Sequence, residues 1–390
     1  AIAAATPAVA DEYPVGTRSS FSDPPYKVGS LRHMDEIFDA RVVRRSGPVS
    51  ELPRGEAIAA LTYDFQGATR DIDDYLRRAH TTGFLVLKDG KIVFERYLLG
   101  ADDASRFTSW SIAKSFVSTL VGFAIDDGLI RSVDDPISDY LPELKGSGYD
   151  AVPIKAVLQM SSGVAFDEDY ESDASDSSRL WSESVSLNRT PTTQFTVESK
   201  SAHPPFAKFN YAGVDTVALG WLVSRVSGKS LSDYLAEKLW GPLGMEGDAT
   251  WVTDNDGQNP AANEIAPCCL NARLRDYARF GLFMLQDGTW QGHQLLSSSW
   301  IEEATRPDRP QVQPGMLYKN YRLGYQYQWW TFPGPDHAFT GQGSNGQFLY
   351  VNPAHQMVIV VTSAWRSEWD GRLERELYAI FDAFAGALDG

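Results

Sequence analysis

A serine and a lysine three residues apart give the sequence its strongest chemical signal. They stand in Ser111-Ile112-Ala113-Lys114, where an apolar pattern predicts a helix over about 112–125. Positions i and i+3 share one face of a helix, so the two side chains can touch. An amine in apolar surroundings loses hydration, which lowers its pKa and lets it accept a proton. We predict that Ser111 is a nucleophile activated by Lys114, the alternative being a capping serine followed by a solvated lysine.

Tyr211 is the second candidate, because it stands where a loop leads into a predicted helix that continues through Trp221. A phenol at such a junction can reach into a cleft. Beside a protonated lysine its pKa would fall, so it would complete the general base and shuttle a proton. The alternative is a packed aromatic ring.

A glycine-rich stretch, Gly341-Gln342-Gly343-Ser344-Asn345-Gly346, leads into a predicted strand and is the third candidate. Glycines let a backbone approach a ligand closely. We expect an edge strand that faces the serine, so that the amides of Ser111 and Ser344 form an oxyanion hole. A flexible bulge or loop is the alternative.

The elements that must position these residues follow from the hydrophobic pattern. Strand patterns occur near both ends of the chain, with a hairpin signal at Asp89-Gly90, and helical patterns fill the middle. This order predicts an α+β fold, an antiparallel sheet flanked by helices with a mainly helical domain inserted into it. We expect an extended arm with little regular structure at 1–55, the sheet domain at 56–130 and 310–390, and the inserted domain at 131–309.

In this order and spacing the three candidates resemble the serine β-lactamase and penicillin-binding-protein superfamily. Its members carry S-x-x-K, then Y-x-N or a variant, then K-T-G or a variant. The matching pairs here are Ser111 with Lys114, Tyr211 with Gly213, and Gly341 with Gly343. The resemblance covers roughly residues 70 to 388, and further stretches, such as Val133 to Pro136 and Met160 to Gly163, are similar to its class-C-like branch.

Two departures from the family pattern bear on the substrate. Gly341 stands where the β-lactam enzymes have a basic residue that helps to hold a carboxylate, and Gly213 stands in place of asparagine. Both argue against dedicated β-lactam hydrolysis. Within the branch the chain is most similar to the 6-aminohexanoate-dimer hydrolases. That resemblance implies a mobile lid around 166–170 whose Tyr170 helps to hold the scissile amide, and an acidic residue, Asp370, near the substrate, besides contacts at Gly213 and Gly343.

The expected activity is hydrolysis of amide, and also ester, bonds of small linear substrates through an acyl-enzyme, without a metal or other cofactor. A carboxylesterase and a D-amino-acid peptidase or β-lactamase remain alternatives, as does an inactive binding module of the same fold. An acidic segment over 167–176 would attract a cationic substrate if it borders the cleft. Other enzyme classes lack support, because the sequence contains neither G-x-S-x-G nor H-E-x-x-H.

The bulk composition limits the partners. The formal net charge is -16, which disfavours nucleic acids and anionic membranes, and no apolar run approaches the roughly 18 residues of a membrane span. The partner expected is therefore a small molecule, and homodimerisation is left open. Residues 1–10 end in Ala8-Val9-Ala10, which resembles a signal-peptide cleavage site, so a periplasmic or secreted location is favoured over a cytoplasmic one. For the adjacent Cys268 and Cys269, two buried thiols are favoured over a vicinal disulfide.

Overall fold

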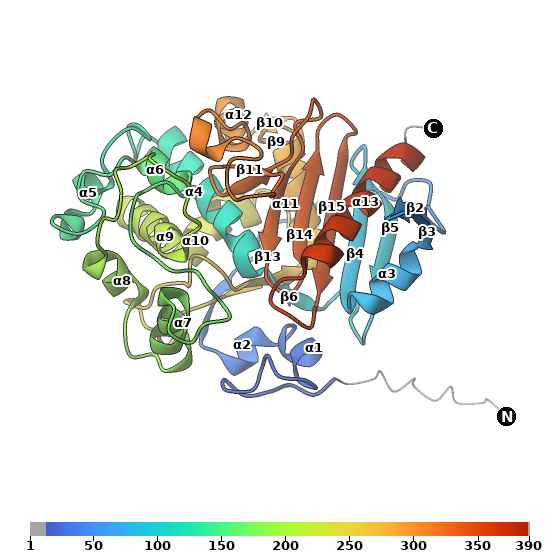
Figure 1. Cartoon of the computed structure of the whole chain (residues 1–390), viewed down its shortest axis with the longest axis horizontal. Coiled ribbons are helices and arrows are strands. Elements are labelled where there is room, and N and C mark those ends of the chain that lie inside the picture. Colours follow the sequence, from blue (N-terminus) through green and yellow to red (C-terminus); the bar gives the residue numbers. More distant parts are fainter. Residues whose placement is uncertain (1–12, 389–390) are drawn as a thin grey trace.

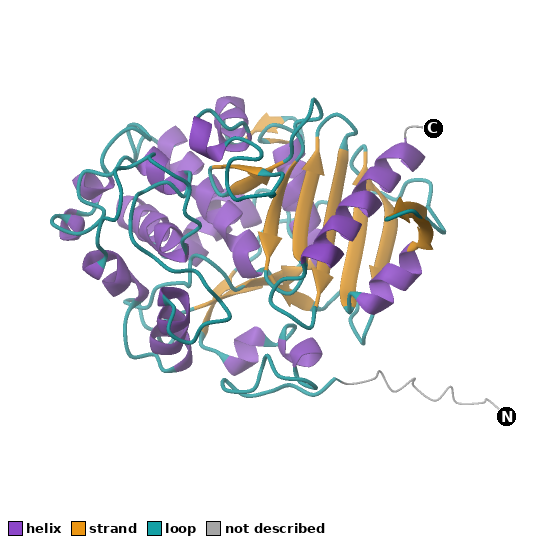
Figure 2. Cartoon of the chain, viewed as in Figure 1, coloured by secondary structure: helices purple, strands orange, loops and turns teal. Residues whose placement is uncertain are grey.

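The structure, a computed structural model, describes residues 13–388 (Figure 1). The sequence that resembles a cleavage site, at 1–10, lies outside the described residues. One half of the molecule holds a large sheet, and the other half is mostly helical with long loops (Figure 2). Within residues 13–388, every helix is too short or too polar to cross a bilayer.

A seven-stranded antiparallel sheet is built from both ends of the chain, which confirms the predicted α+β class. Asp89 and Gly90 turn the hairpin between its last two strands, and both have positive φ, as a two-residue hairpin turn requires. In spatial order the strands are β11 (Gly324–Gln326), β12 (Trp329–Thr331), β13 (Phe339–Gly343), β14 (Gln347–Asn352), β15 (Met357–Ser363), β4 (Thr81–Lys88) and β5 (Lys91–Tyr97).

Both faces of this sheet are covered. Phe84 and Val86 point into a core shared with α13 (Gly371–Leu388) and α3 (Ile72–Arg78), whereas Leu85 and Leu87 join the main core. On that second face lies α11 (Leu274–Leu285), so the sheet stands between helical layers (Figure 1). A strand buried on both sides is apolar throughout, which explains why β4 shows no alternation of polar and apolar residues.

The helical half packs around α4 (Ala113–Asp126), a helix whose residues are buried through most of its length. Its main partner is α9 (Gly213–Ser227). The other helices before β11 are α5 (Ile137–Tyr140), α6 (Ile154–Leu158), α7 (Asp176–Leu180), α8 (Thr192–Glu198), α10 (Leu231–Leu235) and α12 (Ser298–Thr305).

A second sheet joins segments that are far apart in the sequence, and one of them belongs to the N-terminal arm. Its strands, in spatial order, are β1 (Ala40–Val43), β7 (Ala249–Val252), β8 (Leu270–Arg273) and β6 (Arg106–Thr108). The arm was expected to have little regular structure, but β1 belongs to it, as do α1 (Lys27–Ser30) and α2 (Met34–Ile37). A four-residue strand whose partner lies about 200 residues away leaves no local signal. Two small hairpins complete the fold, β2 (Thr62–Phe65) with β3 (Ala68–Asp71) and β9 (Thr289–Trp290) with β10 (His293–Gln294).

Candidate active site

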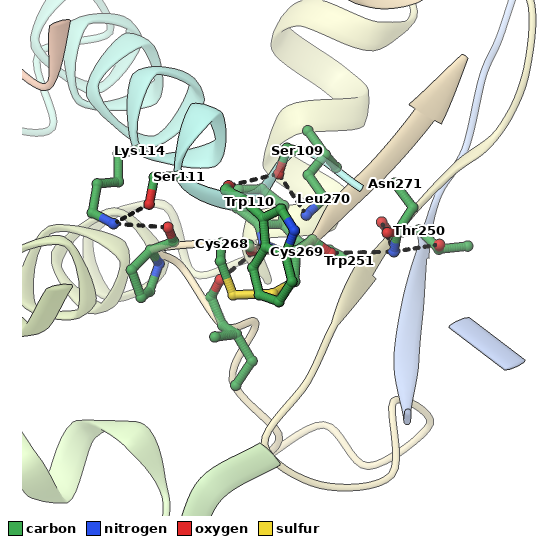
Figure 3. Close-up of a disulfide and its surroundings, with 12 residues drawn as sticks. Ser109, Trp110, Ser111, Lys114, Thr250, Trp251, Cys268, Cys269, Leu270 and Asn271 are labelled. Carbon is green, nitrogen blue, oxygen red and sulfur yellow. Dashed lines mark hydrogen bonds between the residues drawn. A yellow bond between two sulfur atoms is a disulfide. The ribbon is translucent and has the colours of Figure 1, made fainter. Parts of the chain in front are cut away.

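Ser111 and Lys114 meet where the chain enters α4. A 3-10 turn, Trp110–Ile112, carries Ser111, and Lys114 lies in the first turn of the helix. Lys114 Nζ donates hydrogen bonds to Ser111 Oγ at 2.9 Å and to the carbonyl oxygen of Pro267 at 3.0 Å (Figure 3). The structure therefore brings the predicted pair into contact. The Pro267 carbonyl was missed, because a backbone oxygen leaves no signal in the residue types.

The surroundings of Lys114 lower the pKa of its amine. The residue is only 2% exposed, and burial lowers the pKa of Lys114 to about 8, while the negative charge of Glu168 opposes that decrease. An amine with this pKa is partly neutral near neutral pH and can accept a proton.

Two glycines let the sheet approach the turn that carries Ser111. A Cβ atom on Gly343 would lie 2.5 Å from the Ser109 carbonyl oxygen, and one on Gly341 would lie 3.2 Å from Ser115 Oγ. Two expectations for this stretch need correction. The strand β13 is an inner strand between β12 and β14, since the three-residue β12 was not resolved as a separate strand in the sequence pattern. The glycines let strand β13 lie close to the turn that carries Ser111, whereas we expected them to let a ligand lie close to the backbone.

Ser344 follows directly after β13 and faces the same site as Ser111. Both residues line two adjoining cavities, and the Ser344 hydroxyl forms a hydrogen bond with the Glu368 carboxylate. The oxyanion hole formed by the two amides stays a prediction.

Tyr211 reaches the same point from the helical half, two residues before α9 begins. Lys114 Nζ lies 4.8 Å from the centroid of its ring, and its hydroxyl is hydrogen-bonded with Ser111. The expected fall in the pKa of Tyr211 was wrong. Burial raises it well above its ordinary value, the charge of Glu168 adds to the increase, and the hydrogen bond with Ser111 offsets only part of it. Tyr211 therefore stays protonated and can donate to a neighbour.

Glu168 lies in the segment expected to form a lid and contacts residues around Ser111, Lys114 and Tyr211. Its carboxylate accepts hydrogen bonds from the Gly213 amide at 2.6 Å, at the N-terminus of α9, and from the Tyr170 hydroxyl at 2.6 Å. A Cβ atom on Gly213 would lie 3.1 Å from that carboxylate, so the glycine leaves room for it. Tyr170 itself is 45% exposed and lines both cavities. Glu168 was predicted only as a member of the acidic segment, because nothing in the local sequence separates it from its neighbours.

Asp370 has a structural contact of its own, and its place near the substrate stays a prediction. Its carboxylate caps α13 by accepting hydrogen bonds from the amides of Arg372 and Leu373. The acidic side chain at the cavities from this segment is Glu368, whose pKa is raised by burial and lowered in part by Lys27 and by the hydrogen bond with Ser344.

Two cavities adjoin at the cluster, with volumes of about 540 and 290 Å³. The larger one has an aromatic wall, to which Phe21 from the N-terminal arm contributes, and an acidic side with Glu168 and Asp173. Aromatic rings dominate the smaller one: Tyr170, Tyr211, Tyr318, Tyr321, Trp330 and Trp369. In the part of the chain that the structure describes, His, Cys, Asp and Glu side chains do not gather in threes as a metal site requires.

The cysteine expectation is also corrected. Cys268 and Cys269 form a disulfide next to the turn that carries Ser111, with Trp110 packed beside it (Figure 3). Cys268 lines the larger cavity, and Cys269 is fully buried with a φ of 70°. The left-handed backbone brings two adjacent side chains together, which the sequence alone does not reveal.

Comparisons with known proteins agree with this geometry. A family model described as Beta-lactamase matches residues 68–383. The 6-aminohexanoate-dimer hydrolase of Paenarthrobacter ureafaciens is 29% identical over 358 residues, which are 90% of this chain and 88% of that protein. A solved structure from Bacillus anthracis, "Putative 6-aminohexanoate-dimer hydrolase", is similar with a TM-score of 0.84 and 27% identity, over 96% of this chain and 97% of that one. A family VIII carboxylesterase shares the fold, with a TM-score of 0.59 and 18% identity over 80% and 97% of the two chains.

Proposed function

Because the chain belongs to the beta-lactamase family and is a hydrolase of that family, we propose that it cleaves amide and ester bonds through an acyl-enzyme on Ser111. The observation that carries the proposal is the contact between Ser111 Oγ and the buried amine of Lys114 beside the Tyr211 hydroxyl. A nucleophilic hydroxyl, a base of lowered pKa and a protonated phenol are the groups that acyl transfer needs.

Each group has a step that fits its state of protonation. Neutral Lys114 takes the proton of Ser111 as the serine oxygen attacks the carbonyl carbon. Tyr211 gives its proton to the leaving nitrogen or oxygen and regains one from Lys114. The amides of Ser111 and Ser344 hold the negative oxygen, and water then releases the acyl group by the same route in reverse.

The cavities support a linear substrate with a cationic end. Both are lined by Ser111 but otherwise mostly by different residues, so one cavity can take the acyl group and the other the leaving group. Glu168, Asp173 and Glu368 line the larger cavity and would attract an ammonium group. A 6-aminohexanoate oligomer has this shape and charge. The relative from Paenarthrobacter ureafaciens carries this activity in its name.

Rates measured side by side test the proposal. Wild type and Ser111→Ala would be compared on p-nitrophenyl acetate, a 6-aminohexanoate dimer and a D-Ala peptide, with Ser182→Ala as a control at another serine of the cavity wall. We expect turnover of the ester and the dimer, lost only in Ser111→Ala. Turnover of the D-Ala peptide alone, or equal rates in Ser111→Ala, would contradict the proposal.

A carboxylesterase is the second candidate, because Gly341 stands where the β-lactam enzymes have a basic residue and a carboxylesterase shares the fold. Ester turnover without any amide turnover in the same comparison would favour it.

We also propose that the protein works in an oxidising compartment, the periplasm or the exterior. The Cys268–Cys269 disulfide supports this location, since disulfides persist mainly where thiols are not kept reduced. Fractionation of the native host tests this location. Finding the protein only in the cytoplasm would contradict the proposal.

A further inference from the structure

The disulfide between Cys268 and Cys269 adjoins the base of the site and is used by none of the steps above. Its first half continues directly from Pro267, whose carbonyl accepts a hydrogen bond from Lys114 Nζ. Trp110, the residue before Ser111, packs against the apolar cluster that contains both cysteines. The disulfide therefore belongs to the segment that accepts the hydrogen bond from Lys114, next to the turn that carries Ser111 (Figure 3).

Chain stabilisation does not explain a link at this place. A disulfide stabilises a fold mainly by closing a loop in the unfolded chain, and that contribution grows with the length of the loop. These cysteines are one residue apart, so the link encloses almost no chain. What the link restricts is the local backbone, because it closes a small ring that includes the peptide between the two residues.

The Pro267 carbonyl lies between a proline ring and the ring that the disulfide closes. The pyrrolidine ring fixes φ of Pro267, and the disulfide ring begins at the next residue, where it restricts ψ of Cys268 and φ of Cys269 and so holds the residue that follows the carbonyl. Beyond the carbonyl, the Cys268 oxygen accepts a hydrogen bond from Trp251 Nε1 at 2.8 Å, and the Leu270 amide donates to Ser109 Oγ at 3.1 Å. The segment is thus tied to the second sheet and to the turn at Ser111.

The direction of this carbonyl matters for the base. A neutral amine has two N–H donors and one lone pair. If one N–H is held by the Pro267 oxygen, the lone pair can face the Ser111 hydroxyl, from which Nζ lies 2.9 Å away. A carbonyl that rotated away would let the amine turn and would admit water to a lysine that is now 2% exposed.

We propose that the Cys268–Cys269 disulfide is a positioning element for catalysis, which fixes the Pro267 carbonyl and thereby orients Lys114 toward Ser111. The inference rests on the proposed acyl-enzyme function. The two sulfurs do not take part in the reaction, and their effect passes through Pro267.

The test uses the Cys268→Ala/Cys269→Ala variant, with kcat/KM for p-nitrophenyl acetate measured from pH 6 to 10. We expect kcat/KM to fall about tenfold, as a misdirected catalytic group implies. We also expect the acid limb of the profile to move up by at least about half a pH unit, because hydration of Lys114 returns its pKa toward the ordinary value. A wild-type rate with an unmoved acid limb would overturn the inference.

Two controls keep the result decisive. A phosphine reductant should lower the kcat/KM of wild type about as much as the double substitution does, and it should leave the kcat/KM of the double-alanine variant unchanged. Because reduction needs no substitution, this control tests the role of the disulfide even if the variant folds poorly. Cys268→Ala/Cys269→Gly allows the positive φ at 269 without a link, so full activity in that variant would overturn the need for the disulfide. If wild type itself shows no turnover that depends on Ser111, the proposed function fails instead.

Discussion

The pKa of Lys114 determines how kcat/KM should depend on pH. Its pKa of about 8 is caused mainly by burial, and its neutral form is the base. Below pH 8 the neutral fraction, and with it kcat/KM, should rise about tenfold per pH unit. The rise should level off above pH 8. A pH–rate profile of ester hydrolysis checks this expectation, and a rate independent of pH between 6 and 8 would exclude Lys114 as the base.

Glu168 offers a second test of the same amine. Its negative charge raises the pKa of Lys114 against the effect of burial. Glu168→Gln removes the charge and keeps an oxygen that can accept from the Gly213 amide. The pKa of Lys114 should fall further, so the acid limb of the kcat/KM profile should move to lower pH. Asp173→Asn, another acid of the cavity wall, serves as the control and should leave the limb in place. An upward shift in Glu168→Gln would contradict the assignment.

At the scale of single residues, the spacing of Ser111 and Lys114 predicted that these two side chains meet, and the resemblance to the family singled out Tyr211 as the third. The partners of these residues were not predictable. The Pro267 carbonyl and the Cys268–Cys269 link depend on backbone conformation, and Glu168 and Glu368 depend on how loops pack. The pKa of Tyr211 was mispredicted because burial raises it and the charge of Glu168 adds to the increase, and both depend on the folded chain.

At the scale of elements, β13 reaches the nucleophile only because glycine stands at two of its positions. Gly343→Ala would place a methyl group 2.5 Å from the Ser109 carbonyl oxygen, 2.8 Å from Trp110 Cβ and 3.1 Å from the Ser111 amide nitrogen. The turn that carries Ser111 must then shift, so kcat/KM should fall at least about tenfold. Steady-state kinetics with a soluble ester measures the loss.

Gly386→Ala is the matched control for this substitution. Gly386 lies in α13, and a Cβ atom there meets nothing within 4 Å. Alanine should raise helix stability by up to about 1 kcal/mol and leave kcat/KM unchanged. Equal activity in the two alanine variants would show that β13 does not set the position of Ser111.

The elements themselves were mostly visible in the sequence. The turn signal at Asp89-Gly90 marked the hairpin of β4 and β5, and the apolar pattern over about 112–125 marked the helix α4, so both elements occur where expected. The short strands of the second sheet were missed, because β1 and β6 gain their stability from partners far along the chain. The inner position of β13 was missed because the three-residue β12 was not recognised as a separate strand.

At the scale of the whole molecule, the N-terminal arm completes the cavity wall. Phe21 is 8% exposed, and its ring lies 5.2 Å from that of Phe38 and 5.7 Å from that of Trp181. Phe21→Ala should widen the larger cavity, so the rate on a p-nitrophenyl butanoate should rise relative to that on the acetate. Burial of the ring also predicts a loss of roughly 3 kcal/mol in the free energy of unfolding.

Phe94→Ala separates these two effects. Phe94 is buried in the core under α13, away from the cavities. A similar loss of stability is expected there, measured by denaturant unfolding, without a change in the ratio of the two ester rates. The same ratio in Phe21→Ala and wild type would show that the arm does not shape the substrate cavity.

The order of strands, helices and strands predicted the assembly of one sheet from both ends of the chain. The contribution of the arm was not predictable, since its Pro-, Gly- and charge-rich composition resembles that of an unstructured segment. Its aromatic residues find partners only when Trp110 and Trp181 are placed nearby by the rest of the fold.

A covalent acyl-enzyme on Ser111 can be detected by mass spectrometry of the intact protein quenched during turnover of p-nitrophenyl acetate. We expect one added acetyl group, mapped to the peptide that contains Ser111, in wild type and Ser182→Ala but not in Ser111→Ala. An acetyl group on another residue, or turnover by Ser111→Ala at the wild-type rate, would contradict it.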